Sequence, residues 1–210
     1  MYRYRTKPTH DDQDNENGHV TVISTASRIL SVSGGVGPDM ADSFLHNLLT
    51  LSQKNSDPIL LIVNSTGGEL TDGLAMVDLI QAVAAPVHSL VTGLCCSAAT
   101  LFASCCCKRY AFPSSFFLIH ELARGTLPET KFSEVVEDTK VMKDMMHRML
   151  AIYKRSTGAP IAQIRTDLKE SKWLTAKGAL TYGKRGLIDQ IVTKLPPPWR
   201  KLKVKGKDYL

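Results

Sequence analysis

Short apolar runs alternate with segments of helical periodicity through the middle of the chain. Residues 59–63 are apolar without interruption, as expected of a strand buried on both faces of a parallel sheet. Further strands are predicted at residues 28–33, 87–92 and 116–119, and helices at residues 39–51, 70–83 and 98–107. Repeated β-α-β units of this kind predict an α/β layered fold with right-handed crossovers.

A longer helix, predicted at residues 131–154, interrupts this rhythm. Its apolar positions follow the spacing of an amphipathic stripe. Four of these positions are methionines: Met142, Met145, Met146 and Met149. Flexible thioether side chains suit an adaptable contact surface, so the helix either faces the core or docks against another subunit. Two short helices are predicted after it, near residues 161–168 and 175–182.

Length and composition are those of one globular domain. The 210 residues suffice for a substantial core, and the hydrophobic content of 43% and charged content of 22% are ordinary for a soluble protein. No apolar run approaches the roughly 20 residues of a membrane span. The first thirty residues are polar and contain no secretory signal. We therefore expect a cytoplasmic protein that makes no contact with membranes.

Both ends of the chain differ from the middle. A basic and then acidic-polar stretch predicts a flexible N-terminal segment at residues 1–27, followed by a folded domain at residues 28–193. A triple proline then opens a basic tail at residues 194–210, which carries much of the net charge of +6. Such tails can bind nucleic acid, but they are more often solvated or packed on a neighbouring subunit. Nucleic-acid binding is therefore not expected.

The five cysteines form two clumps, at residues 95–96 and 105–107. Adjacent cysteines rarely satisfy disulfide geometry, and neither clump has the spacing or the histidine partners of a zinc site. We interpret them as small buried side chains of a tightly packed helix, with redox sensitivity beside Ser97 as the alternative. The sequence predicts no metal site and no cofactor.

Three segments between residues 64 and 120 carry parts that acyl-transfer chemistry requires. Gly67 and Gly68 form a turn whose backbone N–H groups can approach a substrate closely. Ser97 lies where a strand gives way to a helix, so the N–H of Ala98 is a free donor of the first turn. His120 ends another apolar strand, at the sheet edge where ligands bind in open α/β folds. Together they predict N–H donors for an oxyanion, a nucleophile and a base.

Each of these parts also has a simpler structural interpretation. A Gly-Gly pair is usually only a turn, and a serine that starts a helix is usually its N-cap. A single histidine is more often structural than catalytic, and the chain has six. The residues alone leave both interpretations open.

The order and spacing of these segments resemble the Clp protease proteolytic subunit family, from about residue 28 to residue 192. Residues 62–68 are similar to the family's strand ending in Asn-Ser-Pro-Gly-Gly, and residues 93–99 to its nucleophile motif Gly-Met-Ala-Ala-Ser-Met-Gly. Residues 109–120 resemble its Arg-Tyr/Phe-x-x-Pro-x-Ser…Ile-His segment, and residues 157–167 its Thr-Gly…Ile…Asp stretch.

This resemblance implies roles for individual residues and a quaternary structure. Ser97 would be the nucleophile, His120 the base, and the N–H groups of Gly68 and Ala98 the oxyanion hole. The fold would be the crotonase-like arrangement of the family, with the 131–154 helix as a protruding handle that interlocks two heptameric rings. The rings would enclose the active sites in a chamber fed by an AAA+ unfoldase.

The chain departs from the family pattern at the third catalytic position. The family carries an aspartate two residues before an aromatic-(Leu/Met)-(Ser/Thr)-Ala sequence, which here is residues 173–176, so Ser171 occupies that place. Glu170 and Asp167 lie nearby in the sequence. Thr66 and Ala99 also replace family residues, residues 121–125 lack the family's Gln-Pro and glycine pair, and residues 184–186 are an insertion.

We therefore predict a serine endopeptidase that hydrolyses protein and peptide substrates with Ser97 and His120, as a homo-oligomer of seven or fourteen subunits. Its turnover would be slow unless Glu170, Asp167 or assembly supplies the third group. One alternative is a catalytically weak or inactive scaffold subunit that assembles with active partners. Another is a crotonase-like enzyme acting on acyl thioesters, which needs the oxyanion donors but no nucleophile. No lysine is placed for a Ser-Lys mechanism.

Overall fold

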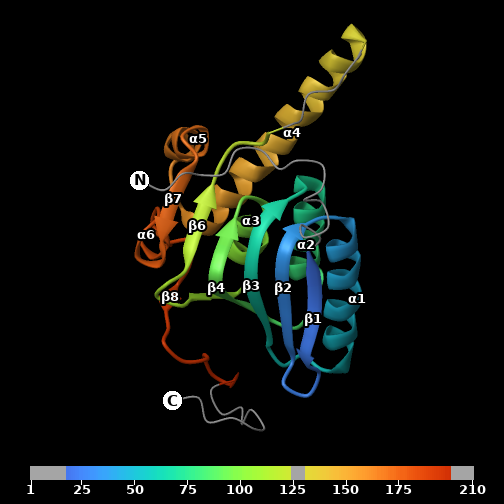
Figure 1. Ribbon diagram of the computed structural model, residues 1–210, viewed down its shortest axis with the longest axis vertical. Coiled ribbons are helices and arrows are strands. Elements are labelled where there is room, and N and C mark those ends of the chain that lie inside the picture. The colour runs from blue at the N-terminus through green and yellow to red at the C-terminus, as the bar shows by residue number, and fades with distance from the viewer. Residues whose placement is uncertain (1–17, 124–130, 200–210) are drawn as a thin grey trace, which may run out of the picture.

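The computed structural model describes residues 18–123 and 131–199, which form one twisted sheet covered by helices (Figure 1). The strands are β1 (His19–Ser24), β2 (Ile29–Val36), β3 (Ile59–Gly68), β4 (Val87–Cys96), β5 (Lys108–Ala111), β6 (Phe116–Ile119), β7 (Lys172–Thr175) and β8 (Gln190–Ile191). The helices are α1 (Pro38–Lys54), α2 (Leu70–Ala82), α3 (Ala98–Ser104), α4 (Phe132–Thr157), α5 (Ile161–Lys169) and α6 (Ala176–Leu180). The α/β class predicted from the sequence is confirmed.

The sheet runs in the order β1-β2-β3-β4-β5-β8, and all neighbours after the antiparallel β1–β2 pair are parallel. Strand β4 has two successive partners: residues 88–91 pair with β5 and residues 94–96 pair with β6. Strand β6 also pairs with β7, antiparallel. The carboxyl end of β4 is therefore shared with a second small sheet segment, and this is where Ser97 and His120 lie.

The main core lies on the face of the sheet that α1, α2 and α3 cover. Helix α1 buries four residues at helical spacing, and β3 contributes Leu61 and Val63 from alternate positions. The intervening residue Leu60 belongs to a smaller apolar cluster on the other face. Strand β3 is thus buried on both faces, as its uninterrupted apolar run predicts.

The structure corrects the predicted elements in several places. Strand β1 lies within residues 1–27, where the sequence predicts a flexible segment, and it pairs with β2 from His19 onward. Strands β5, β7 and β8 were not predicted, because each has four residues or fewer and its pairing partner lies far along the chain. Strand β3 also continues through the predicted turn to Gly68, which pairs with Val36.

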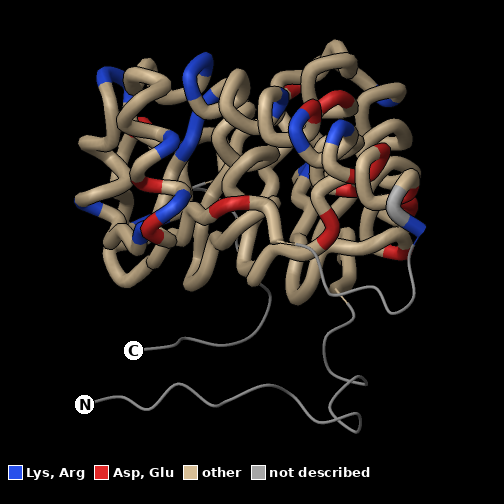
Figure 2. Tube along the Cα trace, turned by 90° about the horizontal axis from the view of Figure 1, so that it is seen from above, with Lys and Arg blue, Asp and Glu red and all other residues tan. Residues whose placement is uncertain are grey.

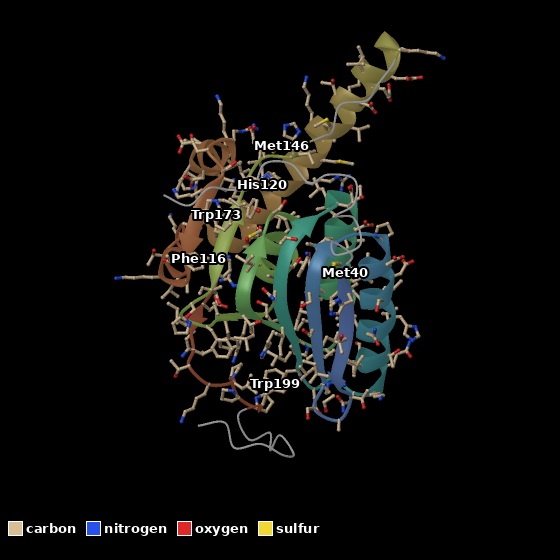
Figure 3. All side chains as sticks on the ribbon, in the orientation of Figure 1. Met40, Phe116, His120, Met146, Trp173 and Trp199 are labelled. Atoms are coloured by element: carbon tan, nitrogen blue, oxygen red, sulfur yellow. The ribbon has the colours of Figure 1, made fainter. Side chains whose placement is uncertain are left out.

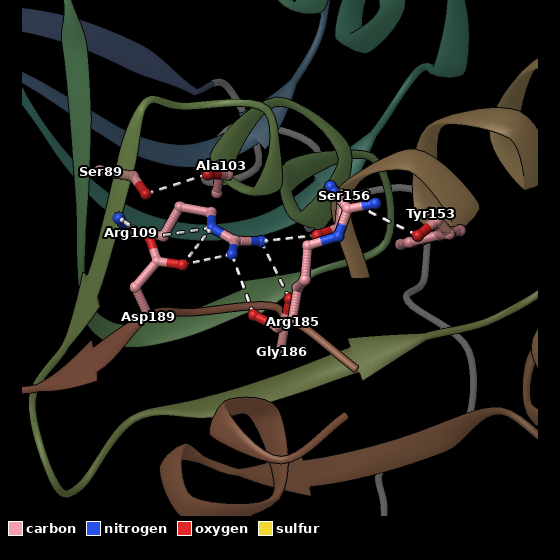
Figure 4. A network of polar contacts seen from close by, with 8 residues as sticks. All are labelled: Ser89, Ala103, Arg109, Tyr153, Ser156, Arg185, Gly186 and Asp189. Carbon is pink, nitrogen blue, oxygen red and sulfur yellow. Dashed lines mark hydrogen bonds and ion pairs between the residues drawn. The ribbon is translucent and has the colours of Figure 1, made fainter. Parts of the chain in front are cut away.

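Arg109 joins residues 185 and 186 to the end of α4 (Figure 4). Its side chain is buried, and its Nε lies 3.1 Å from Asp189 Oδ2. Its two terminal nitrogens donate to the carbonyl oxygens of Ser156, Arg185 and Gly186 at 2.9 to 3.1 Å. Because a guanidinium offers five donors in a rigid fork, one side chain can satisfy the carboxylate and three carbonyls together.

Helix α4 extends well beyond the sheet (Figure 1). Its C-terminal half packs into the core through Met149, Leu150 and Tyr153, and the Tyr153 hydroxyl lies 2.6 Å from that of Thr100. Gly158 ends the helix in the left-handed conformation, with its N–H bonded to Lys154 O. Three valines, Val135, Val136 and Val141, are exposed toward the other end.

Candidate active site

Ser97 occupies a strained turn between β4 and α3. Its φ of 54° and ψ of −128° lie in a region that non-glycine residues rarely adopt. A sharp strand-to-helix turn of this kind presents a serine hydroxyl at the edge of a sheet in α/β hydrolytic enzymes. The Ser97 side chain makes no cap hydrogen bond to α3, so the interpretation of Ser97 as a mere N-cap is not supported.

Gly67 packs directly against this turn. A methyl group built on Gly67 would lie 2.4 Å from Cys96 O, 2.6 Å from Ser97 Cβ and 3.1 Å from Ala98 N. Its φ of 82° adds a second reason for glycine here. A methyl on Gly68 would instead meet Val36 O at 2.2 Å. The glycine that permits close approach to the serine turn is therefore Gly67, which the sequence does not distinguish from its neighbour.

Two polar side chains before the glycines fix the surrounding loops. Asn64 Oδ1 accepts a hydrogen bond of 3.0 Å from Leu94 N. Ser65 Oγ donates to Gly34 O at 2.6 Å and accepts from Gly67 N at 3.1 Å. Sequence analysis did not single out these positioning roles, although an Asn-Ser pair before two glycines is the type of sequence that makes such local bonds.

His120 is carried by the strand that binds the serine turn. Ser97 N donates to Leu118 O at 2.8 Å, and Cys96 pairs with Leu118 in the β4–β6 ladder. His120 directly follows the end of β6, two residues beyond Leu118, which is about 6.6 Å at the rise of a strand. Phe117 and Ile119 are buried in the core whereas His120 is half-buried, so His120 lies on the face of β6 opposite to the core side chains. Figure 3 places His120 at the upper end of this strand.

Ser171 lies at the matching end of β7. The last pair of the antiparallel β6–β7 ladder is Ile119 with Lys172, so His120 directly follows this pair on one chain segment and Ser171 directly precedes it on the other. Leu168 O accepts hydrogen bonds of 3.1 Å from both Glu121 N and Ser171 N, and this joins the chain after His120 to the chain at Ser171. Ser171 also has a positive φ, 54°.

The two nearby carboxylates differ in environment. Asp167 is 5% exposed, and its oxygens accept from Lys172 Nζ at 2.6 Å and from the Tyr182 hydroxyl at 2.8 Å. Burial and the Asp167 carboxylate raise the pKa of Tyr182, so this hydroxyl stays protonated and donates. Glu170 is exposed and follows the end of α5. Asp167 therefore has two partners of its own.

A hollow of about 200 Å³ lies against the segments that follow Gly68 and His120, and its mainly apolar lining also includes Glu69, Thr71 and Asp138. Leu70, which follows the glycine pair by two residues, lines one side, and Leu122, two residues beyond His120, lines another. Val141, Met142 and Met145 of α4 complete the apolar wall. The hollow is thus built from the segments that carry the oxyanion candidates, the histidine and the long helix.

The five cysteines are free, and Cys95, Cys96 and Cys106 are buried, as the sequence predicts. The predicted helical setting is wrong, because Cys95 and Cys96 end β4 and residues 105–107 follow the end of α3. Cys105 is half-buried and Cys107 is exposed, which the sequence does not predict. Among the described residues no group of three or more His, Cys, Asp or Glu side chains could hold a metal ion.

Comparisons with known proteins agree with this architecture. Residues 13–195 match the family described as Clp protease. The chain belongs to the Clp protease family. Curated relatives include the ATP-dependent Clp protease proteolytic subunits of Streptococcus equi subsp. equi (strain 4047) and Streptococcus pyogenes serotype M5 (strain Manfredo). Each is 33% identical over 168 residues, which are 79% of this chain and 84% of the relative.

Membership in the Clp protease family accounts for the mixed sheet and helices. At 33% identity, individual residues of the site require tests of their own. None of the helices that the structure describes has both the length and the apolar character needed to cross a membrane.

Proposed function

We propose that this Clp protease family member is a serine endopeptidase, with Ser97 as nucleophile and His120 as base. The observation that carries the proposal is the Ser97 turn: a strained serine with Gly67 packed against it and its N–H bonded to the strand that ends at His120. A strained turn from a strand into a helix exposes the nucleophilic serine in α/β hydrolytic enzymes, and the Ser97 turn has this form.

The mechanism follows from these positions. His120 accepts the Ser97 proton as the serine oxygen attacks the carbonyl carbon of the scissile peptide. The N–H groups of Gly68 and Ala98 donate hydrogen bonds to the resulting oxyanion. When the tetrahedral intermediate collapses, protonated His120 gives its proton to the leaving amine, and an acyl-enzyme remains. Water, deprotonated by His120, then releases the acyl group and restores Ser97.

The residue at the third catalytic position limits the rate that this mechanism can reach. Ser171 can accept a hydrogen bond from the imidazole N–H, and so hold the ring and its tautomer, but it carries no charge to stabilise the imidazolium. Asp167 cannot supply that charge without giving up Lys172 or Tyr182. We therefore propose a slow peptidase whose histidine is oriented by Ser171.

The apolar hollow suggests which peptides would bind. Its leucine, valine and methionine walls suit an apolar side chain of the substrate next to the scissile bond. Methionines can adjust to side chains of different shape, so we expect a preference for large apolar residues without strict selection.

Two features support a homo-oligomeric ring of seven subunits, or fourteen in two rings. The exposed valines of α4 offer a protruding apolar face to a second copy. Residues 38–82 contain six acidic residues and one lysine, whereas residues 161–194 contain seven basic and three acidic residues. These stretches lie on opposite sides of the subunit (Figure 2), an arrangement that suits head-to-tail contacts around a ring. The relatives are described as ATP-dependent. We therefore propose that this protein also works with an ATP-driven unfoldase.

The test combines serine labelling with peptide hydrolysis. We expect a fluorophosphonate to label Ser97 and the protein to cleave a fluorogenic peptide with a large apolar residue before the scissile bond. Ser97→Ala should abolish both, and His120→Ala should lower both by at least about 10³-fold. Ser114→Ala, at an exposed serine, should change neither. Hydrolysis that survives Ser97→Ala would overturn the proposal.

Ser171 also favours a second candidate, the weak or inactive scaffold subunit. A scaffold subunit of this kind would assemble into a ring of seven or fourteen subunits, but a fluorophosphonate would not label Ser97. Mass measurement in solution alongside the labelling experiment separates the two.

A further inference from the structure

The second face of the sheet carries an apolar strip that the C-terminal segment covers. The strip consists of Ile29, Leu60, Leu90 and Tyr110, from the four strands β2 to β5. The other buried members of this cluster are Val192 and Trp199, at the two ends of residues 192–199. The strip is therefore closed by a segment without regular structure, unlike the opposite face, which three helices cover.

Trp199 is the anchor of this segment. It is 3% exposed although it lies near the end of the chain, and its indole Nε1–H donates to Ser27 O at 2.8 Å. Its ring meets the ring of His88 edge to face, with centroids 5.5 Å apart. Figure 3 shows Trp199 beneath the sheet, at the end opposite to His120. The segment is distant from the candidate active site.

His88 is the group in this contact that can change its charge. It is 6% exposed, and among residues 18–123 and 131–199 its Nδ1 finds no hydrogen-bond partner. Its neighbours in the sheet are Leu60 on β3 and Lys108 on β5, and the Tyr110 ring lies 6.3 Å away. Lys108 is the charged group that acts on His88, and it is a cation. A protonated His88 would therefore be a buried charge beside another positive charge.

We propose that residues 192–199 form a pH-sensitive clasp, in which neutral His88 allows Trp199 to close the apolar strip and protonated His88 releases it. Burial, and secondly Lys108, lower the pKa of His88 from its ordinary value of 6.5. Since the open state binds the proton more readily, the clasp is fully stable above pH 6.5 and loses stability as the pH falls below it. Release exposes the apolar strip of β2 to β5.

Tryptophan fluorescence can follow the clasp, because the chain has two tryptophans and the other one, Trp173, is 47% exposed. In full-length Trp173→Phe protein, Trp199 is the sole reporter. We expect emission of a buried indole at pH 8, and a red shift with several-fold stronger acrylamide quenching between pH 6.5 and pH 5. Far-UV circular dichroism should stay constant over this range, which separates release from unfolding.

Variants of His88 provide the decisive comparison. His88→Phe and His88→Gln, each in the Trp173→Phe background, should remove the transition, whereas His46→Gln, at an exposed histidine, should leave it in place. Two variants are used because one of them could disturb the strand. A transition that persists in a folded His88 variant, or a Trp199 that stays protected throughout acidification of the parent, would overturn the proposal. Ser97→Ala should not affect any of these readings, so the result is independent of the proposed peptidase activity.

Discussion

Lys172 Nζ lies 2.6 Å from Asp167 Oδ1, so the buried carboxylate near the proposed third catalytic position already has an ionic partner. Tyr182 donates to the other oxygen, and the three side chains come from β7, α5 and the end of α6. The cluster joins the elements that flank Ser171. The cluster thereby fixes the start of β7, and with it Ser171, to α5.

Asp167→Asn should therefore act mainly on stability. Removing the charge leaves Lys172 without its partner, and because Lys172 is 38% exposed to solvent, we expect a loss of about 1–3 kcal/mol in the free energy of unfolding. Thermal or urea unfolding measures it, with the exposed Glu170→Gln as the matched control. If Asp167→Asn kept full stability but stopped labelling of Ser97, Asp167 would be a catalytic group.

Ser171→Asp should raise activity. It introduces a carboxylate next to the Ile119–Lys172 pair that ends the β6–β7 ladder, where we expect it to stabilise the imidazolium that forms during acylation. We expect kcat/KM for a fluorogenic peptide to rise by about 10-fold or more, and the loss seen on removing the aspartate of a serine triad, about 10⁴-fold, sets the upper limit. Ser171→Asn, which offers a hydrogen bond without the charge, should give no such increase. Unchanged turnover in Ser171→Asp would show that this position does not serve His120.

Gly67→Ala should inactivate the protein, whereas Gly37→Ala should be tolerated. A methyl at Gly67 would overlap Cys96 O and Ser97 Cβ, and a side chain at a φ of 82° costs about 1–3 kcal/mol. Displacement of the nucleophile by about 1 Å lowers the rate by about 10²-fold. A methyl at Gly37 meets nothing within 4 Å. Peptide hydrolysis and fluorophosphonate labelling of both variants provide the comparison, and equal activities would contradict the packing of Gly67 on the serine turn.

Cysteine reactivity should follow burial. Cys107 is exposed and should react first with a thiol reagent in native protein, and the half-buried Cys105 should react later. Burial raises the pKa of the Cys95 and Cys106 thiols, so they should react only on unfolding. A disulfide reagent releases one coloured thiolate for each cysteine that reacts. Measuring this release against time, with Cys107→Ser as the control, tests the order. Rapid modification of Cys95 would mean that the region beside Ser97 opens in solution.

Elements with strong local patterns were predictable from the sequence. Without a structure, the sequence predicts the apolar run of β3 and the helical stripes of α1 and α4. It also singles out the serine, histidine and glycines of the candidate site. This is because periodicity and turn chemistry depend on residues a few positions apart. The proposed replacement of the family's aspartate by Ser171 was also predicted from the sequence, since it needs only a fixed offset from residues 173–176.

Tertiary structure alone decided which of these residues have partners. The environment of Asp167, the choice of Gly67 over Gly68 at the serine turn, and the pairing of the short strands β5, β7 and β8 depend on contacts between distant segments. Trp199 is the clearest case, because its hydrogen bond to Ser27 spans 172 residues and no local pattern encodes it. By residue type, the segment that ends at Trp199 is only a proline-rich tail. Its burial and long-range contacts show that it closes one face of the sheet.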